Sequence, residues 1–135
     1  MTIETENLSK QYGETRAIDG VSFSLEKNVQ VLALIGPSGG GKSTFLRLIG
    51  GLEVPTSGQV IVDGERLPSE EESLREIRRR NGFLFQSFNL FPHLNALENI
   101  VLPLVKVYGR TRLDATERAN EVVERYLKRP KIRYW

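Results

Sequence analysis

Residues 36–43 constrain this chain more than any other segment, because they read Gly-Pro-Ser-Gly-Gly-Gly-Lys-Ser. They fill every fixed position of the phosphate-loop pattern G-x-x-x-x-G-K-[ST]. An apolar run at residues 29–35 leads into the loop, and a helical pattern at residues 45–49 leads out of it. This strand–loop–helix order predicts an α/β fold and a binding site for a nucleoside triphosphate with Mg²⁺.

The chemistry of the loop follows from its residue types. Glycines let the backbone curl so that the N–H groups of residues 39–44 point into one concavity, beside the positive end of a helix. Lys42 is expected at the β- and γ-phosphates, the Ser43 hydroxyl on Mg²⁺, and Thr44 at the α-phosphate. The alternative is a flexible glycine-rich linker, which needs neither the Lys-Ser pair nor the flanking elements. The expected nucleotide-binding residues of the loop are Gly36, Pro37, Ser38, Gly39, Gly40, Gly41, Lys42, Ser43 and Thr44.

Composition excludes several classes of protein. The 135 residues suffice for one domain with a core, and the absence of cysteine excludes disulfides and thiolate metal sites. The polar start of the chain does not look like a secretory signal, and no apolar run approaches the length of a membrane span. A net charge of +2, from 19 basic and 17 acidic residues, gives little reason to expect a nucleic-acid partner.

Apolar periodicity predicts the elements around the loop. Strands are expected at residues 3–8, 21–25, 29–35, 59–62 and 81–86, and helices at 45–49, 69–80, 95–107 (interrupted at Pro103) and 114–129. Ser69 and Asp114 are expected to cap two of these helices. The apolar strand that ends at Asp63 is expected to form a hairpin rather than a metal site, because Gly64 follows it. The run of arginines at residues 78–80 is expected to complement a helix dipole, with a nucleic-acid patch as the alternative.

The order of the motifs resembles that of ATP-binding cassette (ABC) transporter ATPases. Residues 7–13 match the opening strand and aromatic loop, residues 51–58 the turn after the first helix, and residues 81–86 the glutamine loop. The text of residues 89–100 is similar to that of polar amino-acid importers. The resemblance, from about residue 2 to about residue 128, implies a P-loop NTPase of the ABC ATPase type. It implies an N-terminal antiparallel β subdomain, an incomplete RecA-like core and the start of a helical subdomain.

The implied organisation is a single partial ATP-binding domain. Residues 1–86 correspond to the β subdomain and P-loop core, residues 87–128 to the start of the helical subdomain, and residues 129–135 to a divergent tail. The sequence contains no Leu-Ser-Gly-Gly-Gln signature, no later apolar run ending in Asp-Glu, and no switch histidine. We therefore expect a chain truncated before the signature and Walker B motifs, which binds ATP with little or no hydrolysis. We also expect residues 31–35 to keep an unpaired apolar edge that favours aggregation.

Two further site residues follow from the resemblance. Tyr12 falls where the family stacks an aromatic ring on adenine; the alternative is an ordinary tyrosine at a strand end. Gln86 falls where a side-chain carbonyl approaches Mg²⁺ and the attacking water, and it is otherwise a strand terminus. The resemblance thus implies Lys42 and Gln86 as catalytic residues, Ser43 and Gln86 as metal ligands, and ATP and Mg²⁺ as cofactors.

The function implied is that of an ATP-binding subunit that couples ATP binding and hydrolysis to amino-acid import. The implied partners are a membrane permease subunit and a second ATPase subunit, with the protein in the cytoplasm on the inner face of the cell membrane. Residues 87–99 resemble the permease-facing surface, although their apolar side chains fit a small local core equally well. A catalytically inactive module that docks on a permease is the alternative. A small kinase is a third reading, for which the sequence offers no acceptor site or lid. The apolar residues are Phe88, Leu90, Phe91 and Leu94.

Overall fold

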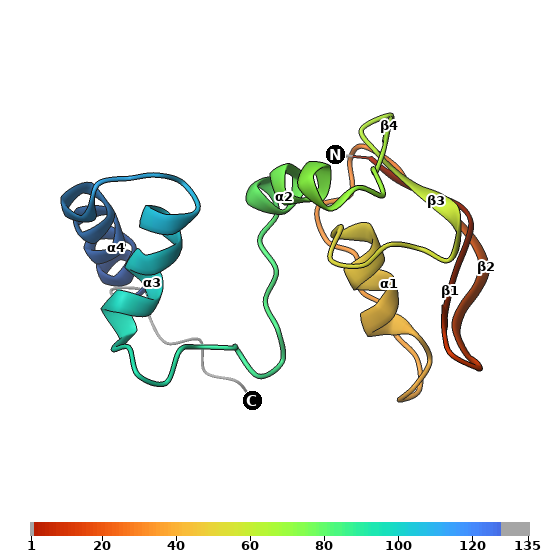
Figure 1. Ribbon diagram of the computed structural model, residues 1–135, viewed down its shortest axis with the longest axis horizontal. Coiled ribbons are helices and arrows are strands. Elements are labelled where there is room, and N and C mark those ends of the chain that lie inside the picture. Colours follow the sequence, from red (N-terminus) through yellow and green to blue (C-terminus); the bar gives the residue numbers. More distant parts are fainter. Residues whose placement is uncertain (1, 128–135) are drawn as a thin grey trace. The chain divides into compact units, whose positions relative to one another are not determined.

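The chain divides into two compact units, and the boundary falls between Phe83 and Leu84 (Figure 1). The computed structural model describes residues 2–127. The tail predicted at residues 129–135 and the helix end predicted at Arg129 lie outside the described residues. The subdomain ranges predicted from the resemblance stay predictions, and each unit is described by itself.

An antiparallel sheet forms the centre of the first unit. Its longest members are β1 (Ile3–Tyr12) and β2 (Thr15–Leu25), which pair as a hairpin. β3 (Ser57–Val62) pairs with the other edge of β1, and β4 (Glu65–Arg66) pairs with β3. The sheet order is therefore β2-β1-β3-β4. The predicted N-terminal antiparallel subdomain is confirmed by this arrangement.

Two local predictions about the sheet are confirmed. Along β2, the half-buried residues 21, 23 and 25 alternate with exposed serines, because successive side chains of a strand point to opposite faces. Between β3 and β4, Asp63 and Gly64 have φ angles of 50° and 84°. Positive φ at both central residues is what a tight hairpin turn requires. The apolar strand that ends at Asp63 is thus one arm of a hairpin.

Helix α1 (Lys42–Ile49) packs against this sheet (Figure 1). Phe45 contacts Phe23 of β2 edge-on, with ring centroids 6.0 Å apart. The helix ends at Gly50, as predicted. Its buried side chains fix the helix, and with it the loop at its N-terminus, against the sheet. The buried core consists of Leu8, Ile18, Phe45, Leu48 and Val60.

Two predicted strands are wrong. Neither residues 29–35 nor residues 81–86 form a strand, and the sheet pairs none of the described strands with either segment. Val31 and Ile35 are 83% and 94% exposed. A β-strand is defined by its hydrogen bonds to a neighbouring strand. An apolar segment that has no partner strand is therefore left as exposed chain. The apolar edge expected at residues 31–35 is accordingly exposed, but as irregular chain.

Helix α2 (Glu71–Arg80) completes the first unit without the predicted capping box. Glu70 holds the N-cap position and makes no side-chain cap hydrogen bond. Instead, the Glu71 carboxylate accepts hydrogen bonds from Arg78 at 2.6 and 3.2 Å. Arg78 also donates from Nε to the carbonyl oxygen of Gly51 at 2.7 Å, which ties α2 to the end of α1. The bidentate ion pair does not cap the helix; it joins the first turn of α2 to its last turn.

The arginine run at the end of α2 contacts its own helix. Arg79 and Arg80 lie 3.4 and 3.7 Å from the carboxylate oxygens of Glu76, about one turn earlier. Such pairs suit a basic helix C-terminus, where cations face the negative end of the dipole. The contacts favour the helix-end interpretation over a nucleic-acid patch.

The second unit contains α3 (Ala96–Lys106) and α4 (Arg112–Leu127), which pack against each other. Val101, Ala115 and Ala119 are buried between them. The interruption predicted in α3 is wrong, because the helix continues through Pro103. It does so although proline has no backbone N–H to donate to the preceding turn. No helix within residues 2–127 has the length and apolar character of a bilayer span.

A cap was predicted for α4 but not for α3. At α3, Asn95 Oδ1 accepts from the Glu98 N–H at 2.8 Å, and Glu98 Oε2 accepts from the Asn95 N–H at 3.2 Å. At α4, the Thr111 hydroxyl oxygen accepts from the Asp114 N–H at 3.2 Å. The cap predicted at Asp114 is therefore wrong: the threonine three residues earlier caps the helix, and Asp114 lies in its first turn.

Candidate functional site

The phosphate loop curls back on itself directly before α1. Gly39 and Gly41 have φ angles of 79° and 76°, in the left-handed region that favours glycine. The Gly40 N–H donates to the carbonyl oxygen of Pro37 at 3.2 Å and closes a turn. The glycines of the motif thus stand where the backbone needs freedom from a Cβ atom.

Gly41 is also the point at which the loop touches the sheet. A Cβ atom on Gly41 would overlap the backbone oxygen of Ala17 and lie 2.8 Å from Cδ1 of Ile18. The carbonyl oxygen of Gly41 accepts the hydrogen bond of the Phe45 N–H at 2.8 Å. Helix geometry leaves the N–H groups before Phe45 without intrahelical acceptors, at the positive end of the helix dipole. This close approach therefore anchors a helix end that suits an anion.

Lys42 is the first residue of α1, and its side chain folds over the loop. Its ammonium group donates to the carbonyl oxygens of Gly36 and Pro37, at 2.9 and 2.6 Å. Both acceptors are neutral. A phosphate oxygen carries negative charge and makes a stronger, charge-assisted hydrogen bond, so the ammonium group favours exchange of a carbonyl for phosphate.

Ser43 and Thr44 follow in the first turn of α1, and Ser43 is exposed to solvent. Within residues 2–127, no group of histidine, aspartate and glutamate side chains is placed to hold a metal ion. Mg²⁺ in proteins is commonly held by one or two protein oxygens together with the phosphates of a substrate. The residues present fit a Mg²⁺ ion that arrives with a polyphosphate, because the exposed Ser43 hydroxyl offers it one protein oxygen, and this role of Ser43 stays a prediction.

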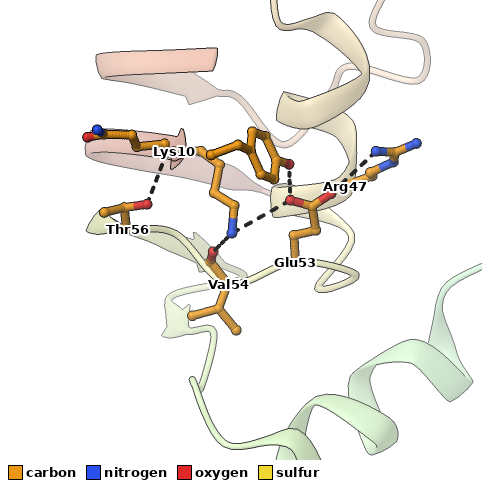
Figure 2. Close-up of polar contacts among 7 residues, drawn as sticks. Lys10, Arg47, Glu53, Val54 and Thr56 are labelled. Atoms are coloured by element: carbon orange, nitrogen blue, oxygen red, sulfur yellow. Dashed lines mark hydrogen bonds and ion pairs between the residues drawn. The ribbon is translucent and has the colours of Figure 1, made fainter. Parts of the chain in front are cut away.

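Tyr12 lies at the end of β1 and belongs to a cluster that the sequence did not predict. Figure 2 shows three labelled members of this cluster, Lys10, Arg47 and Glu53. Its hydroxyl donates a hydrogen bond to the carboxylate of Glu53. The ammonium nitrogen of Lys10 is 3.7 Å from Glu53 Oε2 and 5.2 Å from the Tyr12 ring centroid. Arg47 of α1 lies 3.4 Å from Glu53 Oε1. No sequence pattern links Glu53 to Tyr12, because 41 positions separate them and only the fold joins them.

The surroundings of Tyr12 raise the pKa of its hydroxyl. Partial desolvation is the largest cause and the hydrogen bond to Glu53 the next, while a hydrogen bond from Thr44 lowers the pKa in part. The residue as a whole remains 43% exposed. Tyr12 is therefore held at its hydroxyl end next to Thr44 of the phosphate loop, while part of its surface stays open to solvent.

Gln86 lies in the second unit, at an exposed turn. Tyr12 and residues 36–44 all lie in the first unit. The structure thus brings together Tyr12 and the phosphate loop. The contact of Gln86 with Mg²⁺ and water stays a prediction.

A cavity of about 300 Å³ lies elsewhere in the first unit. Its walls include Leu48, Glu53, Arg66 and Leu74, and none of residues 36–44. The phosphate loop is instead an open surface loop. The loop therefore offers an anion backbone curvature and charge rather than enclosure.

The segment predicted to face a permease exposes most of its apolar side chains. Phe88 and Leu90 are each 65% exposed, and Phe91 is 49% exposed. These values do not fit a small local core, which was the alternative from the sequence. Large exposed apolar side chains that lie close together are typical of interaction surfaces.

Asn99 holds the backbone of this segment in place. Its Nδ2 donates to the carbonyl oxygens of Phe91, Leu94 and Asn95, at 3.2, 3.0 and 3.0 Å. Its Oδ1 accepts from the Phe91 N–H at 2.8 Å. The exposed apolar side chains are therefore presented on an ordered loop.

Comparison with known proteins gives a consistent result. Residues 18–133 match the family described as "ABC transporter". The glutamine transport ATP-binding protein GlnQ of Escherichia coli K12 is 41% identical over 121 residues, which are 90% of this chain and 50% of that protein. The methionine import ATP-binding protein MetN of Brucella abortus is 41% identical over 123 residues, which are 90% of this chain and 33% of that protein.

Among solved structures, the ATP-binding cassette MJ0796, as a dimer bound to ADP and Pi, superposes with a TM-score of 0.79. Its sequence is 36% identical, and the match covers 90% of this chain and 56% of that one. The chain thus spans about half the length, or less, of these relatives. The ABC ATPase fold expected from the sequence is confirmed.

Proposed function

Because the chain belongs to the ABC transporter family, we propose that it binds Mg·ATP through residues 36–44, as the ATP-binding part of an amino-acid importer. One observation carries this proposal. The ammonium group of Lys42, the first residue of α1, lies at the carbonyl oxygens of Gly36 and Pro37, in the same loop in which Gly39 and Gly41 have left-handed φ angles. The cation, the backbone N–H groups of the loop and the positive end of the α1 dipole all favour the same ligand, a polyphosphate.

Each site residue has a part in this proposal. Lys42 binds the β- and γ-phosphates, Ser43 supplies a hydroxyl to Mg²⁺, and Thr44 contacts the α-phosphate. Tyr12 stacks on the base, and Gln86 approaches the metal and a water molecule. Bound Mg²⁺ would offset the charge of the phosphates.

Attack by water requires an oriented nucleophile and groups that stabilise the charge developing on the γ-phosphate. Lys42, Ser43 and Gln86 supply a part of that set.

The proposed partners are a membrane permease and a second ATPase subunit, with the protein on the inner face of the cell membrane. The exposed side chains of Phe88, Leu90 and Phe91 support a protein-facing surface in the second unit. The names of the relatives support transport as the process, since they are import and transport ATP-binding proteins. A module that docks on a permease without catalysis is the second candidate, because this apolar surface does not depend on the phosphate loop.

Calorimetric titration of the folded chain with ATP tests the main proposal. One titration is made in the presence of Mg²⁺, and a second in the presence of a chelator that removes it. Saturable heat that weakens when Mg²⁺ is removed is the expected result. A folded, soluble chain that shows no saturable heat with Mg·ATP would overturn the proposal.

Pull-down on an amino-acid permease in lipid nanodiscs, with and without Mg·ATP, separates the two candidates. Docking that changes with nucleotide, and loses that response in Lys42→Ala, supports the first. Docking that is equal in all samples supports the second.

A further inference from the structure

Glu53 connects the residue proposed to face the base with the helix proposed to face the phosphates. Its carboxylate accepts from the Tyr12 hydroxyl on β1 and pairs with Arg47 of α1 at 3.4 Å. It also lies 3.7 Å from the ammonium nitrogen of Lys10 (Figure 2). None of these three contacts is needed to build the phosphate loop itself.

We propose that Glu53 is a positioning residue, which holds the Tyr12 ring in place to stack on the purine base of a nucleotide bound at residues 36–44. The inference rests on the proposed function, because it needs a nucleotide at the loop. It adds a determinant of base recognition outside the loop motif. Glu53 itself touches the tyrosine and not the nucleotide.

The contacts restrain the ring at two places. The hydroxyl is fixed by the Glu53 carboxylate, and the ammonium group of Lys10 lies 5.2 Å from the ring centroid. Lys10 is itself held by the carbonyl oxygen of Val54, at 2.7 Å. A free tyrosine side chain that is 43% exposed would lose rotamer entropy when it stacks on a base, which weakens binding. A ring that is already restrained loses less entropy, so the contacts raise the affinity for the base.

A negative charge at residue 53 is central to this arrangement. The carboxylate side chain is 21% exposed and lies between two cations, Lys10 and Arg47. Hydrogen bonds to a charged acceptor are stronger than those between neutral groups. Because Arg47 belongs to α1, which begins at Lys42, the carboxylate also fixes the ring relative to the phosphate-binding residues.

Two ligands separate base recognition from phosphate binding. Mg·ATP carries both parts, whereas Mg·tripolyphosphate carries only the phosphates. Calorimetric affinities for both ligands are measured with the wild-type chain, Glu53→Ala, Glu53→Gln and Tyr12→Phe. Glu14→Ala is the matched control, because this exposed glutamate lies in the turn directly after β1.

We expect Glu53→Ala and Tyr12→Phe each to weaken Mg·ATP binding about three- to tenfold, the loss typical of one hydrogen bond. Binding of Mg·tripolyphosphate should not change in either variant. The double variant should lose less than the product of the two single effects, because both changes remove the same contact. Glu53→Gln keeps an acceptor and should recover part of the loss, and Glu14→Ala should match the wild type.

An optical readout reports on the contact itself. The absorbance titration of the tyrosines, compared with that of Tyr12→Phe, isolates the Tyr12 hydroxyl. Its pKa should fall when Glu53→Gln removes the negative charge next to it. A glutamate that does not contact the Tyr12 hydroxyl in solution would leave that pKa unchanged, and this result would overturn the inference. If Glu53→Ala does not fold, Glu53→Gln and Tyr12→Phe still give both readouts.

The remaining outcomes are also decisive. If Glu53→Ala weakens both ligands equally, or neither, Glu53 does not position the base-facing ring, although the proposed function stands. If the folded wild-type chain binds neither ligand, the proposed function fails and this inference fails with it. The wild-type titration therefore distinguishes the two failures.

Discussion

The ammonium nitrogen of Lys42 lies 2.6 Å from the carbonyl oxygen of Pro37, so the phosphate loop holds its own lysine through a backbone acceptor. A second carbonyl, that of Gly36, accepts at 2.9 Å. The cation is therefore ordered over the loop, with neutral groups as its partners. This relationship makes the lysine ready to exchange a carbonyl oxygen for a phosphate oxygen.

Replacing this lysine should abolish most of the affinity without changing the fold. We expect Lys42→Ala to weaken Mg·ATP and Mg·tripolyphosphate at least about tenfold, because both lose a charged hydrogen bond. The melting temperature should stay near that of the wild type, since the lost contacts lie within an exposed loop. Lys27→Ala removes the same charge from an exposed turn and serves as the control. Equal affinities of Lys42→Ala and the wild type would contradict the loop assignment.

Gly41→Ala should destabilise the first unit. The added Cβ meets the Ala17 backbone oxygen, and alanine is strained at a φ of 76°. We expect a loss of about 1–3 kcal/mol in the free energy of unfolding, measured by chemical denaturation. Gly82→Ala is the control, because a Cβ there meets no atom within 4 Å. Equal stabilities of the two variants would show that the close approach at Gly41 does not constrain the chain.

The ion pair in α2 predicts a specific pH dependence. The hydrogen bond from Arg78 is the main cause that lowers the pKa of Glu71 below its ordinary value. A group with a lowered native pKa stabilises the fold above its unfolded pKa, which is about 4.3, and loses this effect as pH falls through the native pKa. The melting temperature of Glu71→Gln should thus lie below that of the wild type at neutral pH, and the gap should close in acid.

Glu72→Gln is the control for this titration, because it removes the next exposed carboxylate of the same helix turn. The melting temperature of Glu72→Gln should differ less from that of the wild type at neutral pH than the melting temperature of Glu71→Gln does. A gap for Glu71→Gln that widens as pH falls would contradict the assignment.

Asn99→Ala should loosen the loop that presents the apolar segment of the second unit. The variant removes the acceptor of the Phe91 N–H and the donor to three backbone oxygens. We expect faster hydrogen exchange of the Phe91 amide, measured by NMR, because its hydrogen bond is lost. Asn120→Ala, at an exposed position of α4, should leave that amide unchanged. Unchanged exchange in Asn99→Ala would exclude the bracing role.

The exposed segment at residues 29–35 should make the chain prone to aggregation. Val31→Lys replaces an apolar side chain that is 83% exposed with a charged one, a change that weakens apolar association between chains. We expect less light scattering at equal concentration and temperature. Gln30→Lys adds the same charge without removing an apolar side chain, so its improvement should be smaller. Equal scattering from Val31→Lys and the wild type would rule out this segment as the cause.

Local patterns predicted much of the first unit correctly. The glycines of the loop, the end of α1 at Gly50 and the turn at residues 63–64 all follow from backbone requirements of single residues. Capping was less predictable. Ser69 and Asp114 have suitable side chains, but Glu70 holds the N-cap position of α2 without a side-chain bond and Thr111 caps α4. Several residues near a helix start compete for the same N–H groups, and sequence alone does not rank them.

The strands predicted at residues 29–35 and 81–86 failed for a different reason. Their apolar character is a property of the sequence, but pairing is a property of two segments. The same distinction applies to Glu53, which no motif marks. Its importance appears only when β1 and α1 bring Tyr12, Lys10 and Arg47 to the same place.

The sequence by itself determined the backbone curl with a cation, since the order of glycine, lysine and serine in residues 36–43 specifies it, and it predicted the ligand class from that curl. It also determined the family, through the order of the motifs. Only the tertiary structure decided which apolar segments became strands and which carboxylate holds Tyr12. The physical reason is that local conformation depends on residues close in the chain, whereas strand pairs and ion pairs join residues that folding alone brings together.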